Sequence, residues 1–464
     1  MPFGSSAKII ALCATLVLGS ATTVAAATGG SSVPGQGGGS TNVSGATGTT
    51  APSPLAKLQR TMAAAMKPLG SDSGAYVVDL DGGQVLFDDD ATIPRYPASV
   101  EKLYTLSTAL DLFGPSGTLH TSVYGVGTLE PGGVWDGDLY LRGGGDPTFG
   151  DEAFVKDWYG TGATVGALAA EVLAAMHITR VNGSVIGDES YFDSLRGDPA
   201  TDYEPDPNLV GELSALSFDR GASGAQGSPP AHAAWELAGA LRRDGVIVTG
   251  HSQAGVTPAG AHLFASIPSP PMSTLAVLTA TPSDDFFAEM ILKGLGARFG
   301  ASGTTADGAA VVKHFIAGLG ITPQIVDGSG LSRGDLTSPL QVVTLLRDLS
   351  PGGDAALQTV GADLHAALPI DGETGTLVTR MIGTAAEGNC QAKTGTLSNA
   401  SDLAGWCDGH YVFALLMNDV NLITAEKAQD KIVEALARYG LPAALSHSKS
   451  ARRPASSSTG TPSR

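Results

Sequence analysis

A serine and a lysine three residues apart form the first candidate for chemistry in the chain. Ser99 and Lys102 lie in the stretch 96–103, YPASVEKL. Leucines follow at helical spacing from Leu103 and Leu106 onward, so the two polar side chains are expected on one face of a first helical turn. A serine hydroxyl is a weak nucleophile at neutral pH, and a lysine that has lost its proton can accept the proton of the serine. We therefore interpret Ser99 as a nucleophile and Lys102 as its general base.

Two further motifs carry the other groups that acyl transfer needs. Ser283 opens a Ser-Asp-Asp stretch, and Lys393, Thr394 and Gly395 follow one another on a predicted strand. A leaving amine must receive a proton, so Ser283 is interpreted as a proton relay. Lys393 and Thr394 offer a cation and a hydroxyl to a substrate carboxylate, and Gly395 would let the substrate backbone approach closely. In this chain order, S-x-x-K, S-D-N and K-T-G are the signature of penicillin-binding proteins and class A β-lactamases.

An oxyanion would form on the carbonyl that Ser99 attacks. Backbone N–H groups stabilise such a charge when they point at it before the reaction begins. The candidates are the N–H groups of Ser99 and of Thr396, the residue after Lys-Thr-Gly.

With these motifs the chain resembles the D-alanyl-D-alanine carboxypeptidase/endopeptidase family, the class C low-molecular-mass penicillin-binding proteins of peptidase family S13. The resemblance runs from about Leu55 to Leu441 and includes the segments 141–148, 187–188, 327–333 and 375–381. It implies an α+β penicillin-binding fold, an antiparallel sheet flanked by helices, with a large inserted domain. It also implies an acyl-enzyme mechanism on peptidoglycan stem peptides, acylation by β-lactam antibiotics, and no cofactor.

Asp285 is the one catalytic-motif position that departs from the family, which usually has asparagine there. The resemblance implies that this residue contacts substrate. An ionised aspartate can only accept hydrogen bonds, and it would also keep Lys102 protonated and so weaken it as a base. A protonated Asp285 would keep a donor and leave activity nearly unchanged; we favour the ionised form. An impaired penicillin-binding protein that binds the cell wall without turnover is therefore the alternative function.

Spacing and patterning divide the chain. About 180 residues separate Lys102 from Ser283, which is enough for a folded domain. We expect a discontinuous catalytic domain over 54–118 and 262–444 and an inserted α+β domain over 119–261. The expected helices are 54–66, one from Ser99 onward, 165–176, 232–243, 273–280, 284–298 and 424–439. The expected strands are 75–80, 84–87, 122–126, 134–141, 324–327, 390–397, 402–407 and 411–417.

Two cysteines lie on consecutive predicted strands. If Lys393 pairs with Ala404, Cys390 and Cys407 face each other at a separation that a disulfide can span. Export to an oxidising compartment would favour the bond, so we predict the disulfide, with two packed free thiols as the alternative.

The first residues predict export. Lys8, the apolar run 9–18 and Ala25–Ala27 have the layout of a signal peptide over 1–27, which places the protein in the cell wall, the periplasmic space or the medium. Left uncleaved, the uncharged stretch would associate with a membrane. Segments 28–53 and 445–464 have the small and polar composition of a disordered linker and tail.

Charge and motif content argue against other functions. The net charge of −18, from 27 basic and 45 acidic residues, argues against a nucleic acid partner. None of the nine histidines lies in an H-E-x-x-H motif, so no metal site is predicted. Ser332 matches a G-x-S-x-G elbow, but that motif needs a strand, a sharp turn and an immediate helix, and a loop is expected here.

Overall fold

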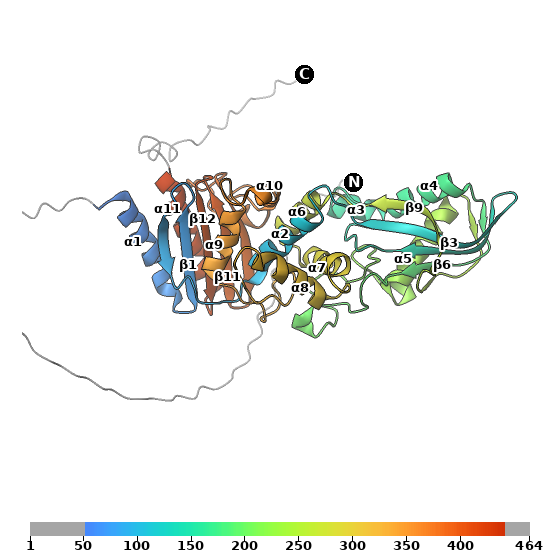
Figure 1. Ribbon diagram of the computed structural model, residues 1–464, viewed down its shortest axis with the longest axis horizontal. Coiled ribbons are helices and arrows are strands. Elements are labelled where there is room, and N and C mark those ends of the chain that lie inside the picture. Colours follow the sequence, from blue (N-terminus) through green and yellow to red (C-terminus); the bar gives the residue numbers. More distant parts are fainter. Residues whose placement is uncertain (1–51, 441–464) are drawn as a thin grey trace, which may run out of the picture. The chain divides into compact units, whose positions relative to one another are not determined.

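The computed structural model describes residues 52–440, which contain two β-sheets and the helices that cover them (Figure 1). The first sheet has five strands in the order β10-β11-β12-β1-β2, and every pair is antiparallel. Its strands are β1 (Ser73–Asp79), β2 (Val85–Asp89), β10 (Cys390–Leu397), β11 (Ala400–Cys407) and β12 (Tyr411–Asn418). The last strand, β12, therefore lies between β11 and the first strand, β1.

Alternating residues of β12 contribute to two separate hydrophobic cores. Phe413 and Leu415 pack with α1 (Pro54–Met66) and α11 (Leu422–Gly440), whereas Val412 and Ala414 pack in the core that contains α9 (Pro339–Asp348). Successive side chains of a strand point to opposite faces, so a strand covered on both faces buries all of its side chains. This explains why every residue of β11 and β12 is buried.

A group of helices packs in the same core as α9. These helices are α2 (Lys102–Leu112), α6 (Met272–Ala280), α7 (Asp285–Phe299), α8 (Thr305–Ala317) and α10 (Gln358–Ala367). Two of them, α2 and α7, carry Lys102 and Asp285. A 3₁₀ turn, η2 (Ala98–Glu101), leads into α2. The expected helix from Ser99 is thus present, but its first turn is 3₁₀ and the α-helix begins at Lys102.

The second sheet is built from residues 120–268, which include most of the segment 119–261 that we expected to be inserted and that is called the inserted segment below. The sheet contains β3 (His120–Glu130), β4 (Val134–Arg142), β5 (Arg180–Val181), β6 (Val185–Asp188), β7 (Ile247–Val248), β8 (Gln253–Ala254) and β9 (His262–Pro268). The main path is β7-β5-β4-β3-β9, while β6 pairs with β4 and β8. Helices α3 (Glu152–Trp158), α4 (Val165–Met176) and α5 (Pro229–Arg243) belong to the same segment. None of these strands pairs with the first sheet in the part of the chain that the structure describes.

The pairing of β9 moves one expected boundary. We expected the catalytic part to resume after Ala261, but β9 continues the second sheet as far as Pro268, which faces His120 of β3. The division into domains otherwise stays a prediction.

The expected strand at 324–327 is wrong. Gln324 makes only an isolated bridge to Leu336. The N–H groups of Val326 and Asp327 instead donate to the carboxylate of Asp335, at 2.6 and 3.3 Å. A side chain therefore takes the place of the neighbouring strand.

The predicted signal, most of the linker and the tail lie outside the described residues. Between residues 52 and 440 no helix is long and apolar enough to cross a membrane.

Candidate active site

The turn that carries Ser99 is strained and tightly packed. Ala98 has a φ of +44°, a left-handed conformation that is uncommon for a residue with a side chain. Two glycines hold the turn in place. A Cβ added to Gly330 would lie 1.8 Å from the carbonyl oxygen of Ala98, and one added to Gly395 would lie 2.6 Å from that of Pro97. Strained backbone persists only where the surroundings over-determine it, and the close packing of Gly330 and Gly395 against this turn contributes to that here.

This packing adds to the interpretation of Gly395. The sequence suggested that the residue makes room for a substrate backbone. The structure adds that its missing side chain makes room for the Ser99 turn of the protein itself, while the approach of a substrate backbone stays a prediction. Gly395 lies against Pro97, so strand β10 borders the Ser99 turn. Thr396, whose N–H is the second oxyanion candidate, is the next residue of this strand.

Lys102 is fully buried and has three hydrogen-bond acceptors. Its Nζ lies 3.0 Å from Ser99 Oγ, 2.5 Å from Asp285 Oδ1 and 2.8 Å from the carbonyl oxygen of Ser329. An ammonium group has three N–H donors, so this set of acceptors fits a charged lysine. The sequence spacing alone predicts that Ser99 and Lys102 are neighbours. The fold places Asp285 beside them, although it is 183 residues from Lys102 along the chain.

The loop 327–335 positions the carbonyl of Ser329. The carboxylate of Asp327 accepts hydrogen bonds from the N–H groups of Ser329, Gly330 and Ser332 at 3.1, 2.6 and 2.7 Å. The Glu289 carboxyl accepts one from Gly328 at 2.9 Å. Burial raises the pKa of Glu289 well above its usual range, and the nearby Asp327 adds to this effect. The loop is thus tied to buried acids behind Lys102, a role that sequence patterns did not reveal.

Asp285 is the first residue of α7. Its side chain is 17% exposed, and burial raises its pKa, while the charge of Lys102 acts in the opposite direction. The structure therefore puts Asp285 beside Lys102, as expected from the motif. Its ionisation state stays a prediction.

Ser283 pairs with the second lysine of the site. Its φ is +63°, and its Oγ accepts a hydrogen bond from Lys393 Nζ at 2.7 Å. Lys393 is fully buried and also donates to the carbonyl oxygen of Thr394 at 2.8 Å. Burial lowers the pKa of Lys393 well below its ordinary value, and the charge of Lys102 lowers it further, while Asp285 acts in the opposite direction. The two lysines are therefore electrostatically coupled.

Thr394 has a partner that sequence reasoning did not assign. Its Oγ1 lies 2.8 Å from Oγ1 of Thr376, which belongs to the family-like segment 375–381. Thr376 is also held through its N–H, which donates to the carbonyl oxygen of Thr281 at 3.2 Å. The hydroxyl of Thr394 is thus oriented by a fixed neighbour.

The disulfide and its register are confirmed. Cys390 and Cys407 are bonded, and Lys393 faces Ala404 in the ladder between β10 and β11. The bond joins the first residue of β10, the strand that carries Lys393, to the last residue of β11.

Ser332 does not form a nucleophile elbow. Its N–H donates to Asp327, its Oγ accepts from the N–H of Gly334 at 3.0 Å, and the next helix, α9, begins only at Pro339. The motif therefore lies in a loop, and the strand–turn–helix that an elbow needs is missing.

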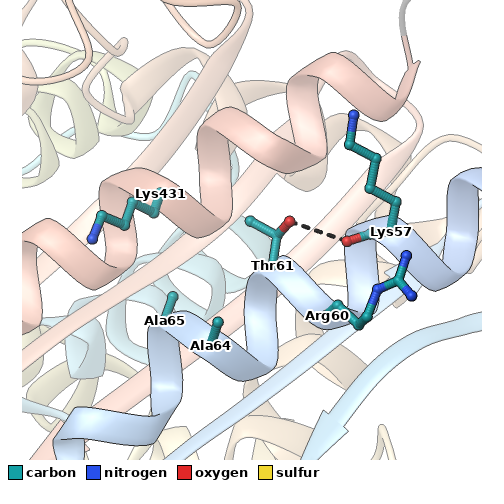
Figure 2. A pocket seen from close by; sticks show the side chains of 6 residues that line it. All are labelled: Lys57, Arg60, Thr61, Ala64, Ala65 and Lys431. Atoms are coloured by element: carbon teal, nitrogen blue, oxygen red, sulfur yellow. Dashed lines mark hydrogen bonds between the residues drawn. The ribbon is translucent and has the colours of Figure 1, made fainter.

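A pocket between α1 and α11 contains none of the motif residues. Figure 2 shows its lining, Lys57, Arg60, Thr61, Ala64, Ala65 and Lys431, with the charged ends of the two lysines and the arginine pointing apart. They do not converge on a common ligand position. Over residues 52–440 no group of three or more histidine, cysteine or acidic side chains is arranged to hold a metal ion.

The fold is that of the penicillin-binding proteins. The structure of penicillin-binding protein 4 from Haemophilus influenzae superposes with a TM-score of 0.67 at 19% identity, over 80% of this chain and 97% of that one. A predatory peptidoglycan endopeptidase from Bdellovibrio bacteriovorus superposes with a TM-score of 0.54 at 18% identity, over 79% of this chain and 92% of that one. The predicted fold class is confirmed.

The chain belongs to the D-Ala-D-Ala carboxypeptidase 3 (S13) family, whose sequence model matches residues 56–208 and 206–439. It is 31% identical to the D-alanyl-D-alanine carboxypeptidase of Actinomadura sp. (strain R39), over 80% of this chain and 82% of that protein. The predicted resemblance is confirmed, and the chain is an enzyme of this carboxypeptidase family.

Proposed function

We propose that the protein hydrolyses the D-Ala-D-Ala end, the D-amino-acid crosslinks, or both, of peptidoglycan stem peptides through an acyl-enzyme on Ser99, and that β-lactams acylate the same residue. One observation carries the proposal: Ser99 contacts Lys102 while Ser283 contacts Lys393, although 110 residues separate the latter pair. Serine–lysine pairs in this arrangement fit nucleophilic acyl transfer.

The mechanism follows from these contacts. Ser99 Oγ attacks the carbonyl carbon of the penultimate D-alanine, and its proton passes to Lys102, which must first have released one of its own protons. The backbone N–H groups of Ser99 and Thr396 stabilise the oxyanion. When the intermediate collapses, the C–N bond breaks and the departing amine takes a proton through Ser283. Water then attacks the acyl-enzyme and frees Ser99.

Lys393 and Thr394 bind the terminal carboxylate in this scheme. A buried lysine whose pKa is depressed gains most from an incoming anion, because the anion restores the favourable environment of the charged form. A β-lactam presents a strained amide and a carboxylate at a similar spacing, which supports its acylation of the same serine.

The wall-binding alternative rests on Asp285. In its ionised form Asp285, 2.5 Å from Lys102, favours the protonated lysine and so slows the base. An impaired enzyme would still label with β-lactams slowly, whereas an active one would also turn over peptide.

Labelling with a fluorescent penicillin, followed by a turnover assay on a D-Ala-D-Ala peptide, tests the proposal. We expect label on Ser99, no label on Ser99→Ala, and unchanged label on Ser332→Ala. Label that maps to Ser332 would show that the assignment is wrong. Label without peptide turnover would support the wall-binding alternative.

We also propose that the protein is exported and works in the cell wall, the periplasmic space or the medium. The apolar run 9–18 after Lys8 and the small residues up to Ala27 support this. Sequencing the N-terminus of the mature protein distinguishes cleavage near Ala27 from an uncleaved segment that associates with the membrane.

A further inference from the structure

Arg220 of the inserted segment contacts the Ser-Asp-Asp motif directly. Its guanidinium donates to both carboxylate oxygens of Asp284, at 2.8 Å to Oδ2 and 3.1 Å to Oδ1. Asp284 is the residue between Ser283 and Asp285. The bidentate pair is shielded from water, since the Arg220 side chain is 5% exposed and that of Asp284 is 19% exposed. Bidentate arginine–carboxylate pairs fix orientation as well as distance.

The guanidinium is itself held from several sides. Its Nε donates to the carbonyl oxygen of Val210 at 2.8 Å, and one terminal nitrogen donates to that of Leu209 at 2.6 Å. Its Cζ lies 4.6 Å from the ring centre of Phe286 and 5.7 Å from that of Trp158. Arg220 is thus a rigid anchor rather than a mobile surface charge.

Asp284 passes this constraint on to the turn at Ser283. Its carboxylate also caps α7 by accepting from the N–H of Phe287 at 3.0 Å, and its own N–H donates to the carbonyl oxygen of Thr279 at 2.8 Å. Ser283 precedes it in a left-handed conformation, with a φ of +63°. A serine in this region is strained, so a neighbour must hold it there.

We propose that Arg220 is a positioning residue through which the inserted segment holds Ser283 in register with Lys393. The inference rests on the proposed function, in which Ser283 relays the proton to the leaving amine. Without Arg220 the turn at Ser283 relaxes, and protonation of the leaving group slows. Attack by Ser99 changes less, because neither Ser99 nor Lys102 contacts Arg220 or Asp284.

A pair of substrates with the same acyl part separates these steps. A peptide ending in D-Ala-D-Ala expels an amine, which needs a proton, whereas the matching thiolester expels a thiolate, which does not. We expect Arg220→Ala to lower kcat on the amide by about tenfold to a hundredfold, the loss of a charged hydrogen-bond pair, and kcat on the thiolester by less than about threefold. Arg220→Lys keeps the positive charge but cannot form the bidentate pair, so it should restore part of the rate on the amide.

A second ion pair supplies the matched control. Asp193, also from the inserted segment, contacts the buried Lys293 of α7 at 2.6 Å, ten residues along the chain from Ser283. Asp193→Asn weakens the same packing without touching the motif, so it should lower Tm and leave the amide-to-thiolester ratio unchanged. Tm and penicillin labelling of every variant show that it has folded.

Equal losses on the two substrates, or the same change of ratio in Asp193→Asn, would overturn the positioning role. If Arg220→Ala does not fold, Arg220→Lys decides, since an unchanged ratio in that variant rules the role out. A wild-type protein that neither labels nor turns over either substrate would instead remove the proposed function, and this inference with it.

Discussion

Lys102 Nζ lies 2.5 Å from Asp285 Oδ1 and 3.0 Å from Ser99 Oγ, so the same ammonium group contacts both an acid and the proposed nucleophile. An ionised Asp285 favours the charged lysine, and the nucleophile needs the neutral one. The substitution of asparagine by aspartate in this motif therefore acts directly on the proposed base.

The first prediction concerns Asp285→Asn. The change removes the negative charge beside Lys102, so β-lactam acylation should speed up by about tenfold at neutral pH, the equivalent of about 1.4 kcal/mol. Stopped-flow acylation rates measure this, with Asp354→Asn, at the exposed cap of a 3₁₀ turn, as the control. An unchanged or slower Asp285→Asn variant would show that Asp285 is protonated or has another role.

The second prediction concerns the pH dependence of carboxylate binding. Because burial and Lys102 depress the pKa of Lys393, the residue becomes neutral below the pH at which an ordinary lysine does. We expect kcat/KM for a peptide with a free carboxylate to fall as the pH rises and Lys393 loses its charge. The same peptide with a C-terminal amide should lack the fall. If kcat/KM fell with pH in the same way for both peptides, the titrating group would be a different one.

A third prediction follows from the contact between Gly395 and Pro97. A methyl group at Gly395 would lie 2.6 Å from the Pro97 carbonyl oxygen and must displace the Ser99 turn. Gly395→Ala should slow acylation of Ser99 by at least about tenfold, a little over 1 kcal/mol. Gly239→Ala, on α5 with its nearest atom 3.5 Å away, is the matched control and should acylate normally. Normal rates in both variants would mean that the turn adapts freely.

Asp371 gives a prediction about stability. Burial raises its pKa to about 7, and neither carboxyl oxygen has a hydrogen-bond partner among residues 52–440. The folded state therefore keeps a proton that the unfolded chain releases near pH 4, so this contribution to stability is lost as pH rises toward about 7. Asp371→Asn should flatten that fall and raise Tm above pH 7. Equal slopes of Tm against pH in the two proteins would contradict the assignment.

The disulfide gives a fifth prediction. Cys390 and Cys407 are 17 residues apart, and closing a loop of this size stabilises a protein by about 3 kcal/mol. The double variant Cys390→Ser with Cys407→Ser should lose about that much free energy of unfolding in a urea titration. Intact mass should rise on reduction, and two alkylatable thiols in the native, unreduced protein would rule the bond out.

The local sequence was enough to predict groups that lie close along the chain. Ser99 and Lys102 are three residues apart, and Lys393 and Ala404 lie on consecutive strands joined by a short turn, so their pairing could be proposed from the sequence and is present in the structure. The carbonyl of Ser329 could not be predicted in the same way, because every residue has one and only the tertiary fold aims it. The β9 boundary was missed because a strand pattern does not reveal which sheet the strand joins.

The pairing of Arg220 with Asp284 was also beyond the sequence. The two residues are 64 positions apart, and neither matches a motif that links them. The wrong strand at 324–327 has a related cause: the segment has the apolar residues of a strand, but the Asp335 side chain accepts the hydrogen bonds that a neighbouring strand would otherwise accept.

The place of β12 has a consequence for truncated chains. It is the last strand of residues 52–440, yet it lies between β11 and β1 and is hydrogen-bonded to both. A chain truncated before Tyr411 lacks β12. In such a chain β1 and β11 have each lost the strand that they pair with in the complete sheet. Such a product would expose two unpaired strand edges, which are templates for aggregation. Loss of the final 30 residues of the described chain therefore removes far more than a terminal helix, because it separates the two halves of the first sheet.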